Sequence, residues 1–182
     1  MLNALRTARG FSLTELMLVV AVAATLLAIG VPVMQDLSET TKLNEASRQV
    51  ERELQSARLK AVSVNATLRV RLNCPADGYF RTVEVIGSAE DNVQNRCVVT
   101  AYPFPAQDSD LMTLPNFDGP LRVMPQGTTV TSAVLEFRPN GTAYQVVSNT
   151  PQAIATDVAI TVTRKNRTRT VRVNRVGKIQ LQ

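Results

Sequence analysis

The chain has 182 residues, of which 45% are hydrophobic and 19% are charged, and its formal net charge at pH 7 is +5. This length accommodates one globular domain and a long additional element, but hardly two domains. Histidine is absent, which excludes Ser-His and Cys-His nucleophile systems, and no glycine-rich phosphate loop occurs. Tryptophan is also absent and aromatic residues make up 4%, which argues against a stacking platform for single-stranded nucleic acid. The composition therefore points away from an enzyme.

The N-terminal region places two cations and a glycine in front of a long apolar segment. Arg6, Arg9 and Gly10 come first, and residues 16–34 then form a stretch of 19 residues without a charge. At ~1.5 Å of rise per helical residue, this stretch is long enough to cross the hydrocarbon core of a bilayer. Glu15 lies at its start, and a carboxylate inside a membrane-spanning segment usually has a partner.

A secretory signal peptide or a plain membrane anchor would also begin with such a segment. A signal peptide fits poorly, because the segment exceeds the usual ~7–15 apolar residues and the small residues before Pro32 form a weak cleavage site. The polar break lies before the apolar segment instead of after it. Cleavage between Gly10 and Phe11 would keep the hydrophobic helix and leave a free amine about one helical turn from Glu15.

A short motif here resembles the class III prepilin signal of type IV pilins and type II secretion pseudopilins; it reads Gly10-Phe11-Ser12-Leu13-Thr14-Glu15-Leu16-Met17. The resemblance implies that prepilin peptidase cleaves between Gly10 and Phe11 and that the new N-terminal Phe11 is methylated. It also implies that Glu15, at the fifth mature position, draws subunits into a filament by neutralising the Phe11 amine of a neighbour. Pro32 matches the proline that pilins have at the twenty-second mature position.

The helical pattern continues beyond Pro32. Apolar residues recur at spacings of three and four, with charged residues around them. The members of this stripe are Leu43, Ala46, Val50, Leu54, Ala57 and Ala61. We predict one helix over residues 11–64, with the membrane-spanning part at about 13–34. Pro32 should kink it or open one turn, because proline removes a backbone donor and clashes with the preceding turn.

From residue 66 the hydrophobic period changes to two, which predicts strands with one buried face. We expect strands at residues 67–72, 81–86, 97–102, 134–137, 143–147, 158–163 and 168–173, with 177–181 closing the chain. The Asn140-Gly141 pair favours a hairpin turn. The predicted fold is therefore α+β, with a long N-terminal helix packed against a C-terminal antiparallel β-sheet head domain. The expected divisions are a leader at 1–10, the helix at 11–64 and the head at 65–182.

The head resembles the minor-pilin and pseudopilin branch known as GspH/FimT, which includes FimU-like proteins. The matching segments are residues 54–58, 137–141 and 173–179; the chain lacks the tryptophan that this branch often has in mid-head. The resemblance implies a structural subunit at or near the tip of a type IV pilus or type II secretion pseudopilus, which helps initiate fibre assembly. Its implied partners are prepilin peptidase, other minor and major pilins or pseudopilins, and the inner-membrane assembly platform.

The positive-inside tendency keeps Arg6 and Arg9 in the cytoplasm and places the head in the periplasm. We therefore expect a single-pass protein of the bacterial inner membrane that later enters a fibre. The two cysteines, Cys74 and Cys97, lie on the oxidising side, which favours a disulfide over two unpaired buried thiols. With two cysteines and no histidine, we expect neither a zinc site nor a cofactor.

The C-terminal part is basic, because no acidic residue follows Asp157. Its cations are Arg164, Lys165, Arg167, Arg169, Arg172, Arg175 and Lys178. One interpretation is that they solvate and protect an edge strand whose Val171 and Val173 face the core. A second is salt-sensitive DNA binding for natural transformation, since several minor pilins of this kind help take up DNA. A third is contact with an acidic partner pilin or with membrane headgroups.

Overall fold

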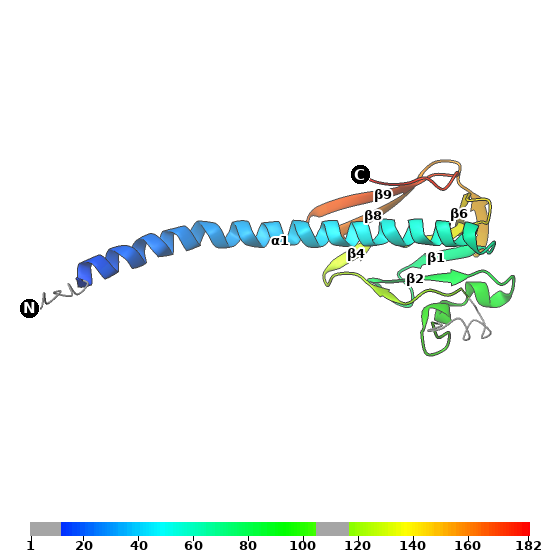
Figure 1. The fold of residues 1–182 in the computed structure, drawn as a ribbon, viewed down its shortest axis with the longest axis horizontal. Helices are drawn as coiled ribbons and strands as arrows, with labels where there is room; N and C mark the ends of the chain where they lie inside the picture. The colour runs from blue at the N-terminus through cyan, green and yellow to red at the C-terminus, as the bar shows by residue number, and fades with distance from the viewer. Residues whose placement is uncertain (1–11, 105–116) are drawn as a thin grey trace, which may run out of the picture. The chain divides into compact units, whose positions relative to one another are not determined.

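The computed structural model describes residues 12–104 and 117–182 (Figure 1). The predicted cleavage site at Gly10 and Phe11 lies outside the described residues. Within them the chain forms a long helix, α1 (Leu13–Ser63), followed by β-strands and two short 3-10 helices. The chain divides into two compact units, residues 1–39 and 40–182, and each is described by itself below.

The described part of the first unit is the N-terminal half of α1, and its large hydrophobic side chains are exposed throughout. Leu13 is 75% exposed and Met34 is 71% exposed. The helix is long and apolar enough, by length and composition, to cross a membrane near its N-terminus. Helical structure continues without interruption across Pro32, so the proline does not open a turn. A kink at Pro32 remains a prediction.

The second unit begins with the C-terminal half of α1, which carries the predicted apolar stripe. All six stripe residues are buried, and Leu43 is the most exposed of them at 3%. Ser47 is buried on the same face, where its hydroxyl donates to the Leu43 carbonyl oxygen at 2.7 Å. This hydrogen bond satisfies a polar group that would otherwise be costly to bury. The amphipathic pattern predicted from sequence is therefore confirmed in this half of α1.

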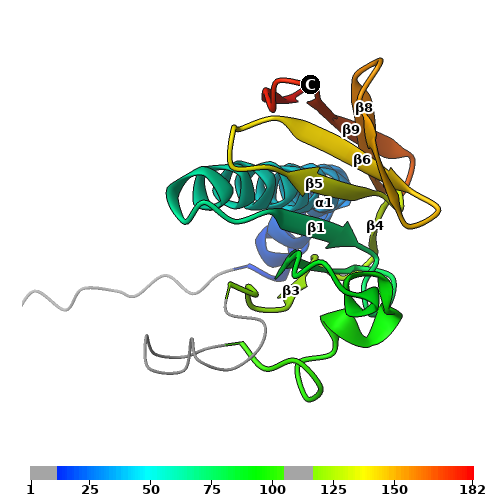
Figure 2. The same ribbon diagram turned by 90° about the vertical axis from the view of Figure 1, so that its right-hand side faces the viewer.

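Two antiparallel sheets pack with this half of α1 around one hydrophobic core. The larger sheet has the order β3-β2-β1-β5-β6-β7 and the smaller one the order β10-β9-β8-β4. The larger sheet contains β1 (Leu68–Leu72), β2 (Tyr79–Glu84), β3 (Arg122–Val123), β5 (Val134–Phe137), β6 (Ala143–Val147) and β7 (Thr150–Ala153). The smaller contains β4 (Thr128–Val130), β8 (Val158–Arg164), β9 (Arg167–Val173) and β10 (Ile179–Leu181). Figure 2 looks along α1 and shows strands of both sheets around it. The predicted α+β fold class is confirmed.

Strand pairing follows the hairpin signals that the sequence carries. In the β5–β6 hairpin, Phe137 pairs with Ala143 across the turn that contains Asn140 and Gly141. In the β8–β9 hairpin, Arg164 pairs with Arg167 across a turn in which Lys165 has a φ of +50°. Three short strands, β3, β4 and β7, were not among the predicted strands.

The strand predicted at residues 97–102 is wrong. The structure instead has the 3-10 helices η1 (Ala89–Asn92) and η2 (Gln94–Cys97), followed by turns. Arg96 and Cys97 are fully buried, and Cys97 is bonded to Cys74 just after β1. This anchoring outweighs the local β-propensity of Val98 and Val99, because strand propensity depends strongly on tertiary context.

The predicted single buried face of β1 is also wrong. All five of its residues are buried, including the two arginines Arg69 and Arg71. Their guanidinium groups donate to the backbone carbonyls of Asp91 and Val93, in and after η1. The η1–η2 segment therefore covers the face of β1 that alternation alone predicts to be solvent-exposed.

The three segments that resemble the GspH/FimT branch meet at one side chain. Arg58 Nε donates to the Gly141 carbonyl oxygen at 3.0 Å, and Arg58 Nη2 donates to the Val176 carbonyl oxygen at 3.2 Å. Gly177 follows with a φ of +74°, and a Cβ at this position would lie 2.3 Å from the Gly141 oxygen and 2.5 Å from Arg58 Nε. Arg58 thus links α1 to one turn of each sheet, and this link needs a glycine at position 177.

We expect Gly177→Ala to destabilise the head strongly. The substitution combines a strained positive φ with a collision against backbone. Gly78→Ala is the matched control, because Gly78 has a φ of +79° and open space where its Cβ would be. Gly78→Ala should cost about 1–2 kcal/mol, and Gly177→Ala should cost about 1–3 kcal/mol beyond that. Chemical unfolding followed by circular dichroism measures both; equal losses would contradict the proposed crowding at Gly177.

Candidate functional site

The first candidate site is the N-terminal turn of α1, where Glu15 lies among exposed apolar side chains. Leu16 is 58% exposed and Met17 is 66% exposed. The Ser12 carbonyl oxygen accepts from the Leu16 N–H at 3.1 Å, which shows that regular helix is already established there. No salt bridge to Glu15 forms within the residues that the structure describes. This turn therefore presents a carboxylate beside an apolar surface whose exposure to water is unfavourable.

The head contains the predicted disulfide between Cys74 and Cys97. The two Cα atoms are 5.5 Å apart and the residues are separated by 23 positions. In the chain-entropy model, closing a loop of this length contributes about 3 kcal/mol to the free energy of unfolding. The closed loop carries β2, η1 and η2, so the disulfide tethers the segment that covers β1.

A group of buried charges lies beneath this segment. Arg96 Nη1 is 3.3 Å from Asp91 Oδ1, and Arg96 Nη2 is 3.4 Å from Asp118 Oδ1. Arg81 Nη2 is 3.8 Å from Asp118 Oδ2, and Arg81 Nε donates to the Gly119 carbonyl oxygen at 2.6 Å. The side chains of Arg81, Arg96 and Asp118 are 0% exposed. The aspartates also receive backbone N–H groups, with Glu84 N donating to Asp118 Oδ1 at 2.7 Å.

A second buried pair lies nearby on the larger sheet. Arg69 Nη2 is 3.0 Å from Glu136 Oε2, with both side chains about 5% exposed or less. Glu136 also lies 3.6 Å from Arg138 Nε, and the Arg138 guanidinium stacks on the Tyr144 ring at 3.6 Å. None of these residues was predicted to belong to a buried cluster. One signal for the cluster was present in the sequence: Arg69 and Arg71 alternate along β1, and Arg81 lies in the next predicted strand. Alternation alone, however, favoured a solvent-exposed face for these arginines.

Burial changes the ionisation of this cluster. Desolvation lowers the pKa of Arg81, although Asp118 opposes that change. Desolvation likewise lowers the pKa of Arg71, and the neighbouring charge of Arg69 adds to the effect. Burial raises the pKa of Asp118 above its ordinary value of 3.8, against the Glu84 N–H and the two arginines that favour its ionised form. The cluster is therefore a place where folding and protonation are coupled.

The basic residues near the C-terminus do not gather into one surface. Arg164 is buried and donates to the Gln126 carbonyl oxygen and, at 3.4 Å, to Thr128 Oγ1. Arg167 donates to Thr40 Oγ1 on α1. The remaining cations are exposed, and they are Lys165, Arg169, Arg172, Arg175 and Lys178.

Alternation places Val171 and Val173 in the core, as predicted, and both are fully buried. Arg169 shares their face of β9, whereas Arg172 lies on the opposite face and donates to Gln182 Oε1 at 2.8 Å. The expectation that this strand is an edge is wrong along Val171–Val173, because β10 pairs with it there. The chain end folds back on the sheet, which local periodicity does not reveal.

A groove of about 720 Å³ lies between α1 and β3, and charged residues of both signs line it, including Glu45, Arg52 and Arg122. Within the described residues, no group of His, Cys, Asp and Glu side chains is arranged to hold a metal ion.

We expect the stability of the head to depend on the pH through Asp118. Because its pKa is raised on folding, the folded state binds more protons than the unfolded state above pH 3.8. The stability that Asp118 contributes is then present at low pH and is lost as the pH rises through its folded-state pKa. Asp118→Asn cannot titrate and should remove this fall, whose slope is at most about 1.4 kcal/mol per pH unit. Urea unfolding of both proteins between pH 3.5 and 7, at about 0.5-unit steps, measures the difference. The free energy of unfolding of the native protein minus that of Asp118→Asn should fall as the pH rises. A rise in this difference with pH would contradict the direction of the pKa change.

Comparison with solved structures supports the fold. The crystal structure of the type IV minor pilin FimU from Pseudomonas aeruginosa strain PAO1 matches with a TM-score of 0.50 and 17% identity, over 80% of this chain and 92% of FimU. A second crystal form of FimU matches with a TM-score of 0.48 and 17% identity, over 77% and 92% of the two chains. The minor pseudopilin EpsH of the Vibrio cholerae type 2 secretion system matches with a TM-score of 0.48 and 8% identity, over 78% and 96%. No protein-family model and no curated protein matches the sequence. This chain thus has the α+β fold of the minor pilin FimU, as its sequence motifs predicted.

Proposed function

We propose that this chain is a minor pilin or pseudopilin, a structural subunit and not an enzyme. It assembles at or near the tip of a type IV pilus or type II secretion pseudopilus and helps initiate the fibre. One observation carries the proposal: an exposed apolar helix with Glu15 in its first turn begins a chain that has the FimU fold. An exposed apolar surface of this length is stable only in a membrane or against other apolar helices.

Processing precedes assembly in this proposal. Prepilin peptidase cleaves between Gly10 and Phe11, removing the leader at 1–10, and the Phe11 amine is methylated. The mature protein is then held in the inner membrane by about residues 13–34, with its head in the periplasm. The disulfide between Cys74 and Cys97 supports this location, because disulfides persist in oxidising compartments.

Assembly depends on the carboxylate of Glu15. When subunits leave the bilayer and their apolar helices pack together, Glu15 enters surroundings of low dielectric constant, where an unpaired charge is costly. The Phe11 amine of a neighbouring subunit supplies the opposite charge. Only one axial offset between helices brings the two groups together, so the pair also selects the register of the subunit in the fibre.

The structural role is favoured over DNA capture. A DNA-binding face needs several cations positioned along one phosphate backbone. Here Arg164 is buried, Arg167 contacts α1, and Arg169 and Arg172 lie on opposite faces of β9. The partners proposed for the head are therefore other minor and major pilins or pseudopilins and the inner-membrane assembly platform.

The intact mass of the membrane-extracted protein tests the processing step. We expect a mature chain that begins at Phe11 and carries one methyl group on its amine. The matched control is the same protein from cells without active prepilin peptidase, where the full leader should remain. A chain that still begins at Met1 in cells with active peptidase would refute the proposed processing.

Substitution of Glu15 tests the assembly step separately. Glu15→Ala should be cleaved and inserted normally, but its incorporation into fibres should fall at least about tenfold, since loss of ~1.4 kcal/mol is already sufficient for that. Glu45→Ala is a suitable control, because Glu45 is also an exposed glutamate of α1 but lies beyond the apolar segment. Immunoblots of sheared fibres against membrane fractions give the ratio. Normal incorporation of Glu15→Ala would exclude the proposed role of the carboxylate.

A further inference from the structure

We propose that a pocket on the larger sheet binds a small oxyanion, either a phosphate group or a carboxylate. The pocket has a volume of about 190 Å³, and residues of η1 and of the turn between β6 and β7 bound it. Arg69 and Arg71 of β1 line it, together with Ser148 and Asn149 of that turn. We call it the arginine pocket. It lies wholly within the second unit, so this inference stands independently of the membrane helix and of the proposed function.

The strand register brings the two arginines to this pocket. Alternate residues of β1 belong to the hydrophobic core, so Arg69 and Arg71 point to the opposite face of the sheet. Val134 of β5 is the register partner of Arg71, and it lines the pocket together with Val146 of β6. The pocket thus combines two guanidinium groups with an apolar wall, beside which electrostatic interactions are stronger than in water.

Arg71 is a buried cation that no carboxylate of the described residues neutralises. It is 8% exposed, and it forms no salt bridge within residues 12–104 and 117–182. Its Nη1 donates to the Val93 carbonyl oxygen at 2.6 Å, and its Nη2 donates to Gln94 Oε1 at 3.3 Å. Both partners are neutral, and burial of a charge without a counter-ion is costly. The lowered pKa of Arg71 has this cause, with the charges of Arg69 and Arg96 adding to it.

Arg69 has a counter-ion but shares it with another arginine. Glu136 Oε2 is 3.0 Å from Arg69 Nη2, and Glu136 Oε1 is 3.6 Å from Arg138 Nε. Arg69 Nη1 donates to the Asp91 carbonyl oxygen and to Asn92 Oδ1. Arg69 Nε, however, is buried and has no hydrogen-bond partner, which is unfavourable for a charged donor. An oxyanion in the pocket would supply the negative charge that the two arginines lack.

One acidic residue, Asp91, also lines the pocket, but its carboxylate is already engaged. Its oxygens accept from the N–H groups of Ile86 and Gly87 at 2.9 and 2.8 Å, and Oδ1 lies 3.3 Å from Arg96 Nη1. Arg69 receives only the backbone carbonyl of this residue. The charge of Asp91 is therefore balanced by Arg96, and Arg71 is left uncompensated.

The size of the pocket limits the ligand. A volume of about 190 Å³ is below the roughly 300–1,000 Å³ of pockets for drug-sized molecules, so the pocket admits one small group. Guanidinium groups bind carboxylates and phosphates through strong charge-assisted hydrogen bonds. Ser148 and Asn149 are exposed at the rim and add polar groups there. The same chemistry fits free phosphate and the acidic side chain of another molecule, and the two probes below separate these sources.

The test measures unfolding of the full-length chain by urea in micelles of an uncharged detergent at pH 7. Sodium phosphate or sodium acetate replaces sodium chloride at constant ionic strength, and the fluorescence of the three tyrosines, all of them beyond residue 64, reports on the head. We expect saturable stabilisation with half-saturation on the order of 1 mM. At ten times that concentration the equilibrium constant for unfolding should fall about elevenfold. A response to phosphate alone would assign the pocket to phosphate groups, and an equal response to acetate would assign it to carboxylates.

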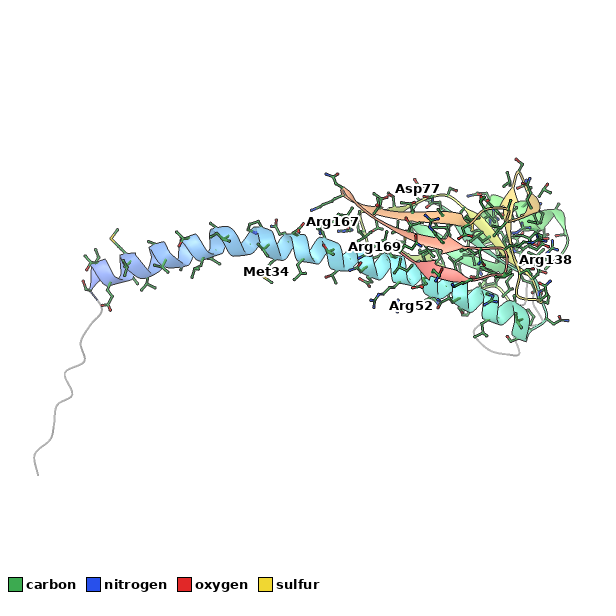
Figure 3. All side chains as sticks on the ribbon, turned by 90° about the horizontal axis from the view of Figure 1, so that it is seen from above. Met34, Arg52, Asp77, Arg138, Arg167 and Arg169 are labelled. Carbon is green, nitrogen blue, oxygen red and sulfur yellow. A yellow bond between two sulfur atoms is a disulfide. The ribbon has the colours of Figure 1, made fainter. Side chains whose placement is uncertain are left out.

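Matched variants connect the effect with the pocket. Ser148→Asp places a carboxylate on the pocket wall and should abolish the response, whereas Ser148→Asn has the same shape without the charge and should keep it. Position 148 has a φ of +48°, which Asp and Asn tolerate. Arg71→Gln should also abolish the response. Arg169→Gln should not, because Figure 3 shows Arg169 toward the opposite end of the head from Arg138, which shares Glu136 with Arg69.

Phosphate also stabilises proteins as a general salt, without a specific site. Such an effect would be equal in the native chain and in every variant. That result, or no stabilisation by either anion, would overturn this inference and leave the proposed function standing, because the proposed function depends on the N-terminal helix. Ser148 is exposed, so the comparison of Ser148→Asp with Ser148→Asn decides the question even if Arg71→Gln fails to fold.

Discussion

The buried stripe of α1 between Leu43 and Ala61 is the contact on which the rest of the head depends. Alanine at three of its positions lets strands of both sheets approach the helix, and every stripe residue is at most 3% exposed. The two sheets share one core through this stripe. Burial of a helix face at roughly 25 cal/mol per Å² of apolar surface is non-directional, so it fixes proximity but not the rotation of each sheet about the helix. Arg58 supplies that direction, since its two hydrogen bonds reach one turn of each sheet.

The buried arginines serve a different purpose. A buried ion pair is weak evidence for stability, because desolvation of two charges can exceed their attraction. The raised pKa of Asp118 and the lowered pKa of Arg81 have this cause. The cluster instead restricts the conformation of the η1–η2 segment. Arg96 must reach both Asp91 and Asp118, and few arrangements of the segment allow that. The disulfide restricts the same segment from its end at Cys97, which reduces the alternatives further.

The sequence predicted the parts of the fold that depend on local pattern. The stripe of α1, the two hairpins and the pairing of two cysteines each follow from spacing or composition. The cover over β1 did not, because Arg69 and Arg71 alternate with apolar residues as they would on a solvated strand, and their partners lie more than 20 residues away. Strands β3 and β7 were not predicted for another reason. Strand β3 has only two residues, and β7 contains Pro151 and is recognised by its pairing with β6. The processing motif stays a prediction from sequence, whereas the separation of the basic residues between two faces of β9 required the structure.

The two halves of α1 meet opposite requirements with one continuous helix. Residues 43–61 present a narrow stripe that a single head can cover, whereas residues 13–34 are apolar around the whole circumference and remain exposed in the isolated chain. A helix that is apolar on all sides needs a surrounding medium or several neighbours, and exchange of lipid for neighbouring helices leaves its apolar burial nearly unchanged. The free energy of that exchange is then decided by the few polar groups involved. Glu15 is the one acidic residue among residues 13–34, so the proposed function assigns the step from membrane to fibre to a single carboxylate.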